Sequence, residues 1–206
     1  MQYTESLVPH LNATLTLPWE SQVAQETSAY TEENLDYWSK RYKGRDLKQI
    51  MQAKLEILSW AERDPNLNFS FERLCRIQEI LLGKEVRFRK SEAFCRNRRY
   101  TYFEDLEDMF KRKLSQDSKD ICHPLARGLR LYLDIIHFHP FEDGNSRAAY
   151  LWFNYVMAQA RQDVPSFGKI GLLTTLPITV ENYKLLLEFC KKQQSSRTRS
   201  ESEVTI

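Results

Sequence analysis

Apolar side chains recur at helical spacing in six stretches of this chain. In residues 45–61, for example, leucine, isoleucine and methionine lie three or four positions apart, as on the buried face of an amphipathic helix. The other stretches with this pattern are residues 70–82, 103–114, 121–136, 148–160 and 179–190. Only six glycines and seven prolines occur in 206 residues. The pattern therefore predicts a mostly helical protein.

Some helix ends are indicated by particular residue types. Ser70 precedes an apolar run as an N-cap residue, with Phe69 and Leu74 placed as a hydrophobic staple. Gly83 follows the same run and is a typical C-terminal stop. Thr179 is placed to cap the last helix in the same way as Ser70.

A short polar loop separates the apolar runs 121–136 and 148–160. Its sequence from His139 to Arg147 is His-Pro-Phe-Glu-Asp-Gly-Asn-Ser-Arg. The two apolar runs predict buried helices on either side of the loop. The loop therefore concentrates polar, titratable side chains at the end of the hydrophobic core.

The second half of this loop has the residue types of an anion site. Gly144 permits a backbone turn that a side chain would disfavour. Asn145 and Ser146 are N-cap residue types, which predicts that the following helix begins there. The free N–H groups of its first turn and the helix dipole favour phosphate, and the guanidinium of Arg147 can bind phosphate oxygens.

The first half of the loop adds reactive chemistry. Asp143 offers carboxylate oxygens, and Mg²⁺ on nucleotide phosphates typically uses one or two such groups. His139 has an ordinary pKa of about 6.5, which a nearby helix N-terminus would lower, so its imidazole is neutral at pH 7 and can accept a proton from a hydroxyl group. The loop therefore predicts a base, a metal ligand and an anion site for phosphoryl or nucleotidyl transfer.

The loop resembles the signature of the Fic family of the Fic/Doc superfamily, His-x-Phe-x-Asp/Glu-Gly-Asn-Gly/Lys-Arg-x-x-Arg. The resemblance covers residues 45–192, identified on this basis as a Fic domain, and is strongest over residues 121–150. It implies an all-α, Fic-type helical core with one β-hairpin flap, in which Phe141 buries the loop.

The resemblance also implies an activity and its site residues. The expected protein is an adenylyltransferase that moves AMP from ATP to a hydroxyl side chain of a target protein (AMPylation). In this scheme His139 is the catalytic base and Asp143 binds Mg²⁺. The nucleotide-binding residues are Gly144, Asn145, Ser146 and Arg147.

Two positions depart from the family pattern. Ser146 replaces the usual glycine or lysine, and its hydroxyl could still cap the helix or face a phosphate. The last arginine of the signature falls at Tyr150, whereas nucleotidyl-transferring members are expected to hold the terminal phosphate of ATP with that arginine. Members that transfer phosphate or phosphocholine look similar in lacking it, so these groups are alternatives to AMP.

Residues 1–44 are predicted to form an N-terminal arm that lies on the domain and contains a helix. Many Fic proteins carry an inhibitory helix with the pattern Ser/Thr-x-x-x-Glu-Gly/Asn, and Ser28 and Glu32 match it, while Glu33 departs from it. Glu32 is therefore a candidate inhibitory residue. Its usual partner arginine is Tyr150 here, so a solvated acidic helix is an equally good interpretation.

Residues 84–100 contain seven basic side chains among aromatic ones. The alternation over residues 85–89 predicts a short strand, and the family resemblance places a β-hairpin flap here. We expect this basic hairpin to bind the backbone of the target protein as an added strand. The second interpretation is a hairpin whose basic side chains are simply solvated. The third is binding to nucleic acid, which no sequence motif supports.

His137 offers a competing site, because His137 and His139 with Asp143 would make three zinc ligands. This leaves the rest of the loop unexplained, and a core role for His137 is more ordinary. Tyr183 is a candidate contact for the nucleotide base, although a core aromatic is the simpler interpretation. The alternative to an enzyme is a catalytically silent protein-binding module that uses the basic hairpin.

The remaining features bound the location of the protein. The net charge of +2 predicts no general attraction to nucleic acid or membranes. The N-terminus lacks the basic and apolar regions of a signal peptide, and no apolar run approaches the about 20 residues of a membrane span. Four cysteines lack C-x-x-C spacing. Together these features predict a cytoplasmic protein. The polar composition of residues 193–206 separately predicts a disordered tail.

Overall fold

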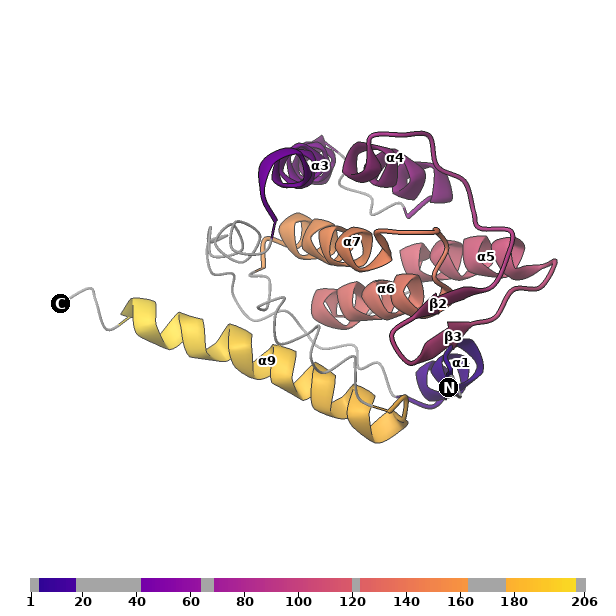
Figure 1. The fold of residues 1–206 in the computed structure, drawn as a ribbon. Helices are drawn as coiled ribbons and strands as arrows, with labels where there is room; N and C mark the ends of the chain where they lie inside the picture. The colour runs from indigo at the N-terminus through magenta and orange to yellow at the C-terminus, as the bar shows by residue number, and fades with distance from the viewer. Residues whose placement is uncertain (1–3, 18–41, 64–68, 120–122, 163–176, 203–206) are drawn as a thin grey trace.

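The structure, a computed structural model, describes residues 4–17, 42–63, 69–119, 123–162 and 177–202. Within these residues seven helices surround a core, and a small three-stranded sheet lies at one side (Figure 1). This confirms the predicted all-α fold with one hairpin. The elements in chain order are β1 (Thr4–Glu5), α1 (Leu7–Thr16), α3 (Gly44–Arg63), α4 (Phe71–Leu82), β2 (Ala93–Cys95), β3 (Arg98–Tyr100), α5 (Leu106–Lys119), α6 (Pro124–Phe138), α7 (Asn145–Gln159) and α9 (Val180–Ser202).

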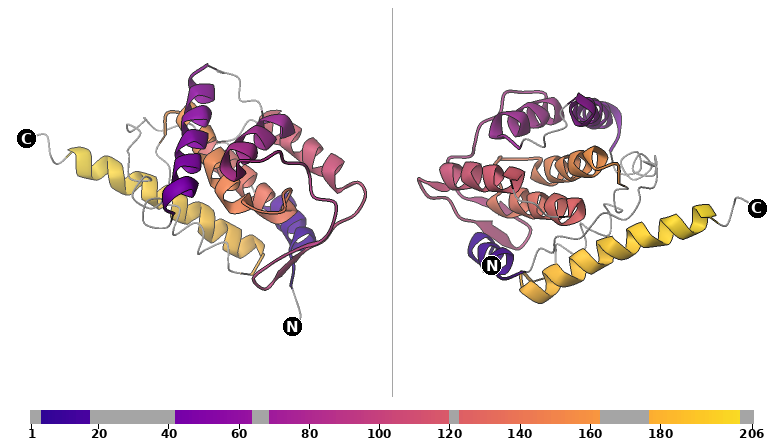
Figure 2. Two further views of the ribbon diagram at one scale, coloured as in Figure 1. Left: turned by 45° about the horizontal axis from the view of Figure 1, so that its top comes forward. Right: turned by 180° about the vertical axis from the view of Figure 1, so that it is seen from behind.

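Helices α6 and α7 form the centre of the molecule. They pack against each other, with α3 and α4 on the side of α7 and with α1, α5 and α9 on the side of α6 (Figures 1 and 2). In α6 every residue from Leu129 to Phe138 is buried, and in α7 every residue from Ala148 to Met157. A helix that is buried on all sides needs an apolar surface all round, which explains the dense apolar runs at these positions. The short loop between the two helices therefore has both of its ends fixed in the core.

The helix ends indicated by the sequence are confirmed. The hydroxyl oxygen of Ser70 accepts a hydrogen bond from the Arg73 backbone N–H at 3.2 Å, which caps α4. Gly83 ends that helix in the left-handed conformation, at φ 65°. The Thr179 hydroxyl accepts from the Asn182 N–H at 3.2 Å and caps α9. Within the described residues, no helix combines the length and apolar character needed to cross a membrane.

The hairpin lies within the predicted residues 84–100, but its first strand begins later than the sequence predicts. Residues 85–89 are not a strand but part of an extended strap, residues 84–92, and the hairpin consists of β2 and β3. The alternation over 85–89 arises because Phe88 turns inward onto the rings of Phe71 and Phe110, while its neighbour Arg87 stays exposed. One backbone hydrogen bond, from the Arg89 N–H to the Pro140 carbonyl at 2.9 Å, joins the strap to the polar loop.

The first described residues form part of the core and not only an arm on its surface. Strand β1 pairs in parallel with β3, so that β3 lies in the middle of the sheet. Helix α1 then buries Leu7 and Ala13 against the domain, and Pro9 is tolerated in its first turn, where no helical N–H bond is lost. The predicted disordered tail also differs, because α9 continues to Ser202. Its Lys, Gln, Arg and Glu residues favour helix despite their polarity.

A buried polar network attaches α1 to α6. The two ring nitrogens of His10 contact the Asp134 carboxylate at 2.6 Å and the Tyr183 hydroxyl at 2.8 Å, and His10 is fully buried. The ring of His10 stacks on that of His137 at 4.6 Å, and His137 contacts the Ser6 hydroxyl at 2.6 Å. The ammonium group of Lys113 approaches the second oxygen of Asp134 at 3.2 Å. Such a network specifies one docking position for α1, because each buried polar group needs its partner.

We predict that His10→Ala lowers the free energy of unfolding by about 3 kcal/mol, because it removes a hydrogen-bond partner from a fully buried carboxylate. Asn12→Ala, an exposed position on the same helix, is the matched control and should change stability by less than about 0.5 kcal/mol. Urea unfolding of both variants provides the measurement. Equal stabilities for the two variants would contradict the role given to the network.

Candidate active site

His139 lies at the point where α6 ends. It is the C-cap residue of the helix, and its backbone adopts the left-handed conformation at φ 51°, ψ 58°. Glycine is the residue that adopts this conformation without strain, and a non-glycine residue here is uncommon. A histidine at a position that favours glycine indicates that its side chain has a use beyond the turn.

The ring of His139 is held on one face by Tyr100. The two rings stack with their centres 4.0 Å apart and 20° between their planes, while part of the His139 side chain remains accessible to solvent. Burial lowers the pKa of His139 to about 4; the Arg89 charge adds to this, and the Ile136 carbonyl and Asp143 oppose it. The imidazole is therefore neutral at pH 7, as the sequence predicts, although burial and not the helix terminus is the main cause.

Asn145 holds the loop closed. Its side-chain oxygen accepts from the Phe141 N–H at 3.0 Å and its amide donates to the Phe141 carbonyl at 2.8 Å. The predicted capping role of Asn145 is thus wrong, because its amide bonds back into the loop and is buried. The ring of Phe141 is buried and stacks on Phe71 at 6.0 Å, as predicted for the residue that anchors the loop.

Gly144 is the N-cap residue of α7 and has φ 75°. A Cβ atom at this position would lie 2.5 Å from the side-chain nitrogen of Gln78, which is itself buried and donates to the Asp143 carbonyl. The close approach and the positive φ both explain the glycine. Gly144 has no side chain to cap α7, so it leaves the N–H groups of the first turn uncapped and able to bind an anion.

Near the start of α7 the polar side chains of the loop are Asp143 and Ser146, which are exposed, and Arg147, whose side chain is 14% exposed. The Asp143 side chain is 78% exposed and lies 3.6 Å from the Arg147 guanidinium. One of its oxygens accepts from the Gly144 N–H at 2.6 Å. Ser146 is exposed in the first turn of α7 and is not its cap. The guanidinium of Arg147 lies over the ring of Tyr42 at 5.7 Å, which supports it from the side of α3.

The donor set suits a magnesium ion that is shared with phosphate groups. Within the described parts of the chain, no cluster of three His, Cys, Asp or Glu side chains could hold a metal alone. One exposed carboxylate beside an uncapped helix N-terminus matches Mg²⁺, which is often held by one or two carboxylates plus substrate phosphates. Asp143 is the residue that would bind it.

The zinc interpretation is not supported, because His137 does not face the loop. It is 1% exposed and contacts Ser6 and His10 in the core. Tyr183 is likewise a core residue whose hydroxyl contacts His10. Tyr150, at the last arginine position of the family pattern, is fully buried within α7. Glu32 and Ser28 lie outside the described residues.

The basic region 84–100 separates into exposed and buried parts. Five of its cations are exposed, namely Lys84, Arg87, Lys90, Arg96 and Arg99. Surface carboxylates pair with three of them, through the contacts Arg87–Glu85, Lys90–Glu107 and Arg99–Glu92. Of the other two, Arg98 is half-buried, and Arg89 is only 3% exposed and cannot belong to a docking surface.

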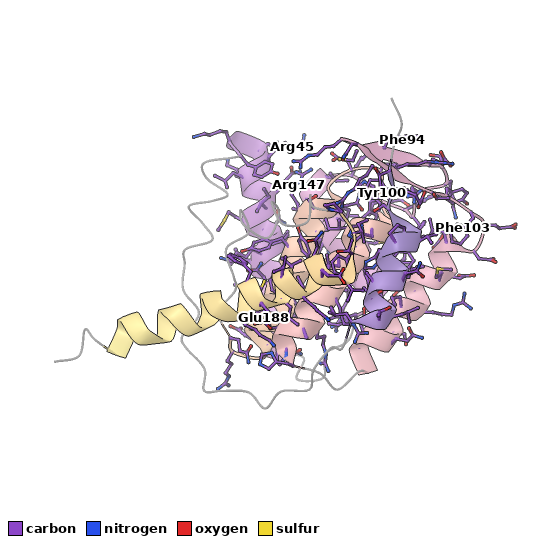
Figure 3. The ribbon with its side chains drawn as sticks, turned by 90° about the horizontal axis from the view of Figure 1, so that it is seen from below. Arg45, Phe94, Tyr100, Phe103, Arg147 and Glu188 are labelled. Carbon is purple, nitrogen blue, oxygen red and sulfur yellow. The ribbon has the colours of Figure 1, made fainter. Side chains whose placement is uncertain are left out.

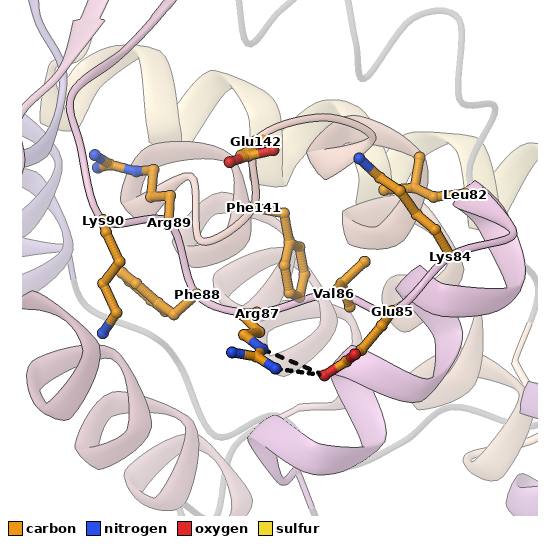
Figure 4. A pocket seen from close by; sticks show the side chains of 10 residues that line it. All are labelled: Leu82, Lys84, Glu85, Val86, Arg87, Phe88, Arg89, Lys90, Phe141 and Glu142. Carbon is orange, nitrogen blue, oxygen red and sulfur yellow. Dashed lines mark hydrogen bonds and ion pairs between the residues drawn. The ribbon is translucent and has the colours of Figure 1, made fainter.

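Two exposed aromatic rings accompany these cations. Phe94 of β2 is 53% exposed and Phe103, just after the hairpin, is 36% exposed; Figure 3 shows both on the same side of the molecule as Tyr100. A cavity with a volume of about 360 Å³ lies between the strap and residues Phe141 and Glu142, and side chains of residues 84–90 line it (Figure 4). The hairpin and strap thus present cations, aromatic rings and a hollow next to the loop.

Sequence reasoning missed three residues that shape this site: Tyr100 against the His139 ring, Gln78 beneath Gly144, and Arg89 behind the loop. They belong to other elements, 39 to 66 positions away from the loop residues they contact. The only signal in the sequence was the placement of Arg89 directly after the apolar Phe88, in a segment where other arginines are exposed.

Comparisons with known proteins support the resemblance to Fic proteins. Residues 68–157 match the model of the family described as the Fic/DOC family. No curated protein matches the sequence significantly. Among solved structures, the chain is similar to the crystal structure described as IbpAFic2 covalently tethered to Cdc42, with a TM-score of 0.60 and 16% identity over 91% of this chain and 68% of that one.

The chain is also similar to a Fic family protein from Desulfovibrio desulfuricans G20, with a TM-score of 0.54 and 15% identity over 97% of this chain and 65% of that one. At these identities the likeness concerns the fold, and this chain spans about two thirds of the length of both structures. The chain therefore has the fold of Fic proteins, and residues 68–157 match the Fic/DOC family model.

We predict that Gly144→Ala destabilises the protein by about 2 kcal/mol, since it strains the backbone and displaces the buried Gln78 amide from Asp143. Gly44→Ala is the matched control: Gly44 also has a positive φ, 56°, but a Cβ there meets nothing within 4 Å. It should cost about 1 kcal/mol. Thermal or urea unfolding gives both values, and a loss at Gly144 no larger than at Gly44 would show that the Gln78 contact is unimportant.

We also predict that His139 titrates near pH 4 in NMR spectra of its ring Cε1–H group. Because this pKa lies below the unfolded value of about 6.5, protonation favours the unfolded chain. The contribution of His139 to stability is therefore complete above pH 6.5 and is lost as the pH falls from 6.5 through 4. A midpoint near 6.5 would mean that the ring is not shielded as the Tyr100 stack requires.

Proposed function

We propose that this Fic/DOC-family domain transfers a phosphate-containing group from a nucleotide to a hydroxyl side chain of a target protein, with AMP from ATP as the first candidate. One observation carries the proposal. A neutral, partly exposed imidazole ends one buried helix, and six residues later the next helix begins with an uncapped, glycine-led N-terminus. The first group suits proton removal, and the second suits phosphate binding.

The nucleotide phosphates would bind the first turn of α7. The backbone N–H groups of Asn145, Ser146 and Arg147 point out of the helix N-terminus, whose dipole favours negative charge. The Arg147 guanidinium adds a cation, and it is already oriented by Tyr42 and Asp143. Asp143 would hold Mg²⁺, which neutralises negative charge on the phosphates when it is bound.

His139 would act as the general base through its Nε2 atom. Its Nδ1 lies 3.4 Å from the Ile136 carbonyl oxygen, which can only accept a hydrogen bond. A neutral ring therefore carries its proton on Nδ1 and leaves Nε2 free to accept one. The target hydroxyl gives its proton to Nε2 as its oxygen attacks phosphorus. For AMP transfer the α-phosphorus is attacked and pyrophosphate leaves.

The transferred group could also be phosphate or phosphocholine. The position of the last signature arginine is occupied by Tyr150, which is fully buried in α7 and carries no charge. A terminal phosphate of ATP would then lack the cation that the family pattern provides. This observation favours the alternative, in which phosphate or phosphocholine is transferred instead of AMP.

We infer that the target protein binds the hairpin and strap of residues 84–100. In the described sheet β2 is an outer strand, so its free edge can accept an extended segment of the target. The exposed ring of Phe94 and the surrounding arginines would contact the side chains of that segment. The neighbour tethered to Cdc42 shows that another Fic protein engages a protein partner. A catalytically silent module would use the same surface.

We predict that His139→Ala lowers the rate of transfer by about 10³-fold, because it removes the base, and leaves the fold intact. His123→Ala is the control: His123 caps the opposite end of α6 and should leave the rate within about twofold of wild type. Incubation with α- or γ-labelled ATP, followed by intact-mass measurement, identifies the group transferred.

The outcomes separate the alternatives. Label from the α-position supports AMP transfer, whereas label from the γ-position alone supports phosphate transfer. Equal rates of transfer in His139→Ala and wild type would refute the assignment of His139 as the general base. No added mass with any nucleotide, in wild type and in Glu32→Gly alike, would favour the silent binding module.

A further inference from the structure

Arg89 is a buried cation that binds backbone carbonyl groups instead of a carboxylate. Within the described residues its side chain takes part in no ion pair shorter than 4 Å, although it is 3% exposed. Its Nε donates to the His139 carbonyl at 2.7 Å. One terminal nitrogen donates to the carbonyls of Thr101 at 2.7 Å and Phe138 at 3.2 Å. The other terminal nitrogen donates to the Ser91 carbonyl.

These bonds place one rigid group between three segments. The carbonyls of Phe138 and His139 belong to the C-terminus of α6, where the helix leaves acceptors without helical partners and favours a positive charge. The Thr101 carbonyl follows β3, and Ser91 belongs to the strap. A fifth bond, from the Arg89 backbone N–H to the Pro140 carbonyl at 2.9 Å, extends the contact to the next loop residue.

The same guanidinium therefore fixes both partners of the ring stack at the site. It binds the backbone of His139 directly, and it binds Thr101, the residue adjacent to Tyr100. The His139 and Tyr100 rings lie 4.0 Å apart, although the two residues are 39 positions apart in sequence. Because a guanidinium is planar and presents its donors in a fixed fork, it sets the relative position of the carbonyls that it binds.

Burial of a charge is expensive unless each donor finds a partner. An apolar side chain would fill the space behind the loop without the free-energy cost of burying a charge. Core packing alone therefore does not account for an arginine here. The strain at His139 is a second reason for a clamp, because a non-glycine residue in the left-handed region persists only where its surroundings hold it. Both observations concern the backbone of the proposed base.

We propose that Arg89 is a positioning residue for the reaction: it holds the backbone of His139, and with it the ring, in register with Tyr100 and the hairpin. This inference rests on the function proposed above for His139. Arg89 lies behind the loop and acts on the reaction only through His139. A second consequence concerns the hairpin. Arg89 supports both the hairpin that is expected to bind the target and the base that is expected to activate the target's hydroxyl group.

The test compares Arg89→Gln and Arg89→Lys with Arg112→Gln, a matched control at an exposed position of α5 outside the proposed docking surface. Arg89→Gln should lower kcat for transfer roughly 100-fold, because small misplacements of a catalytic group cost about this much. The KM for the nucleotide should stay within about twofold, since the anion site on α7 is not altered. Arg89→Lys should recover part of kcat, because it keeps the charge but not the fork. Arg112→Gln should match wild type.

NMR gives a second measurement that needs no activity. Loss of the Arg89 charge and of the tight packing should raise the pKa of His139 from about 4 toward 6.5 in Arg89→Gln. The Asp143 carboxylate, which favours the protonated form of His139, is present in both proteins. In wild type the Arg89 Nε–H should exchange slowly with water, whether or not the variants fold.

These measurements separate the two proposals. If wild type transfers nothing, the proposed function fails, and the positioning role is decided by the His139 pKa and the Nε–H exchange alone. If wild type is active but Arg89→Gln keeps its kcat, the positioning role is wrong while the function stands, even when the variant melts at a lower temperature. Rapid exchange of the Arg89 Nε–H in wild type would overturn the positioning role without any variant.

Discussion

The packing of α6 against α7 is the constraint on which the site depends. Both helices are buried on nearly all sides, and α3, α5 and α9 hold them in place. A loop of six residues must therefore join two ends that cannot move apart. It does so by placing His139 and Gly144 in the left-handed conformation, and the Asn145 amide closes the turn onto Phe141. The rigid core compensates for strain that an isolated loop would release.

This arrangement also explains why the loop can be reactive and still be well ordered. The atoms that hold it are backbone carbonyls and amides contacted by Gln78, Arg89 and Asn145, all of which are buried. The side chains that would meet a nucleotide are Asp143, Ser146 and Arg147; of these, Asp143 also accepts a hydrogen bond from the Gly144 N–H and contacts Arg147. Support and chemistry are thus carried largely by different residues, so that an exposed residue such as Ser146 can differ from the family pattern without loss of the fold.

The N-terminal segment connects to the same site from the other side. Strand β1 extends the hairpin sheet, and α1 docks on α6 through His10, Asp134 and His137. His137 is two residues before His139 on the same helix end. The position of the first described residues is therefore linked, through buried polar contacts that tolerate little displacement, to the helix that carries the proposed base.

The sequence by itself determined the helical class, most helix positions, the caps at Ser70, Gly83 and Thr179, and the loop with its candidate residues. These follow from local periodicity, from cap chemistry and from a contiguous motif that resembles a known family. It placed the strand at residues 85–89 wrongly, gave Asn145 a capping role, and counted Arg89 among surface cations. Only the tertiary structure decided those points, and it alone brought Tyr100, Gln78 and His10 to their partners. The physical reason is that burial and hydrogen-bond pairing join residues 39 to 173 positions apart, and neither leaves a periodic trace in the chain.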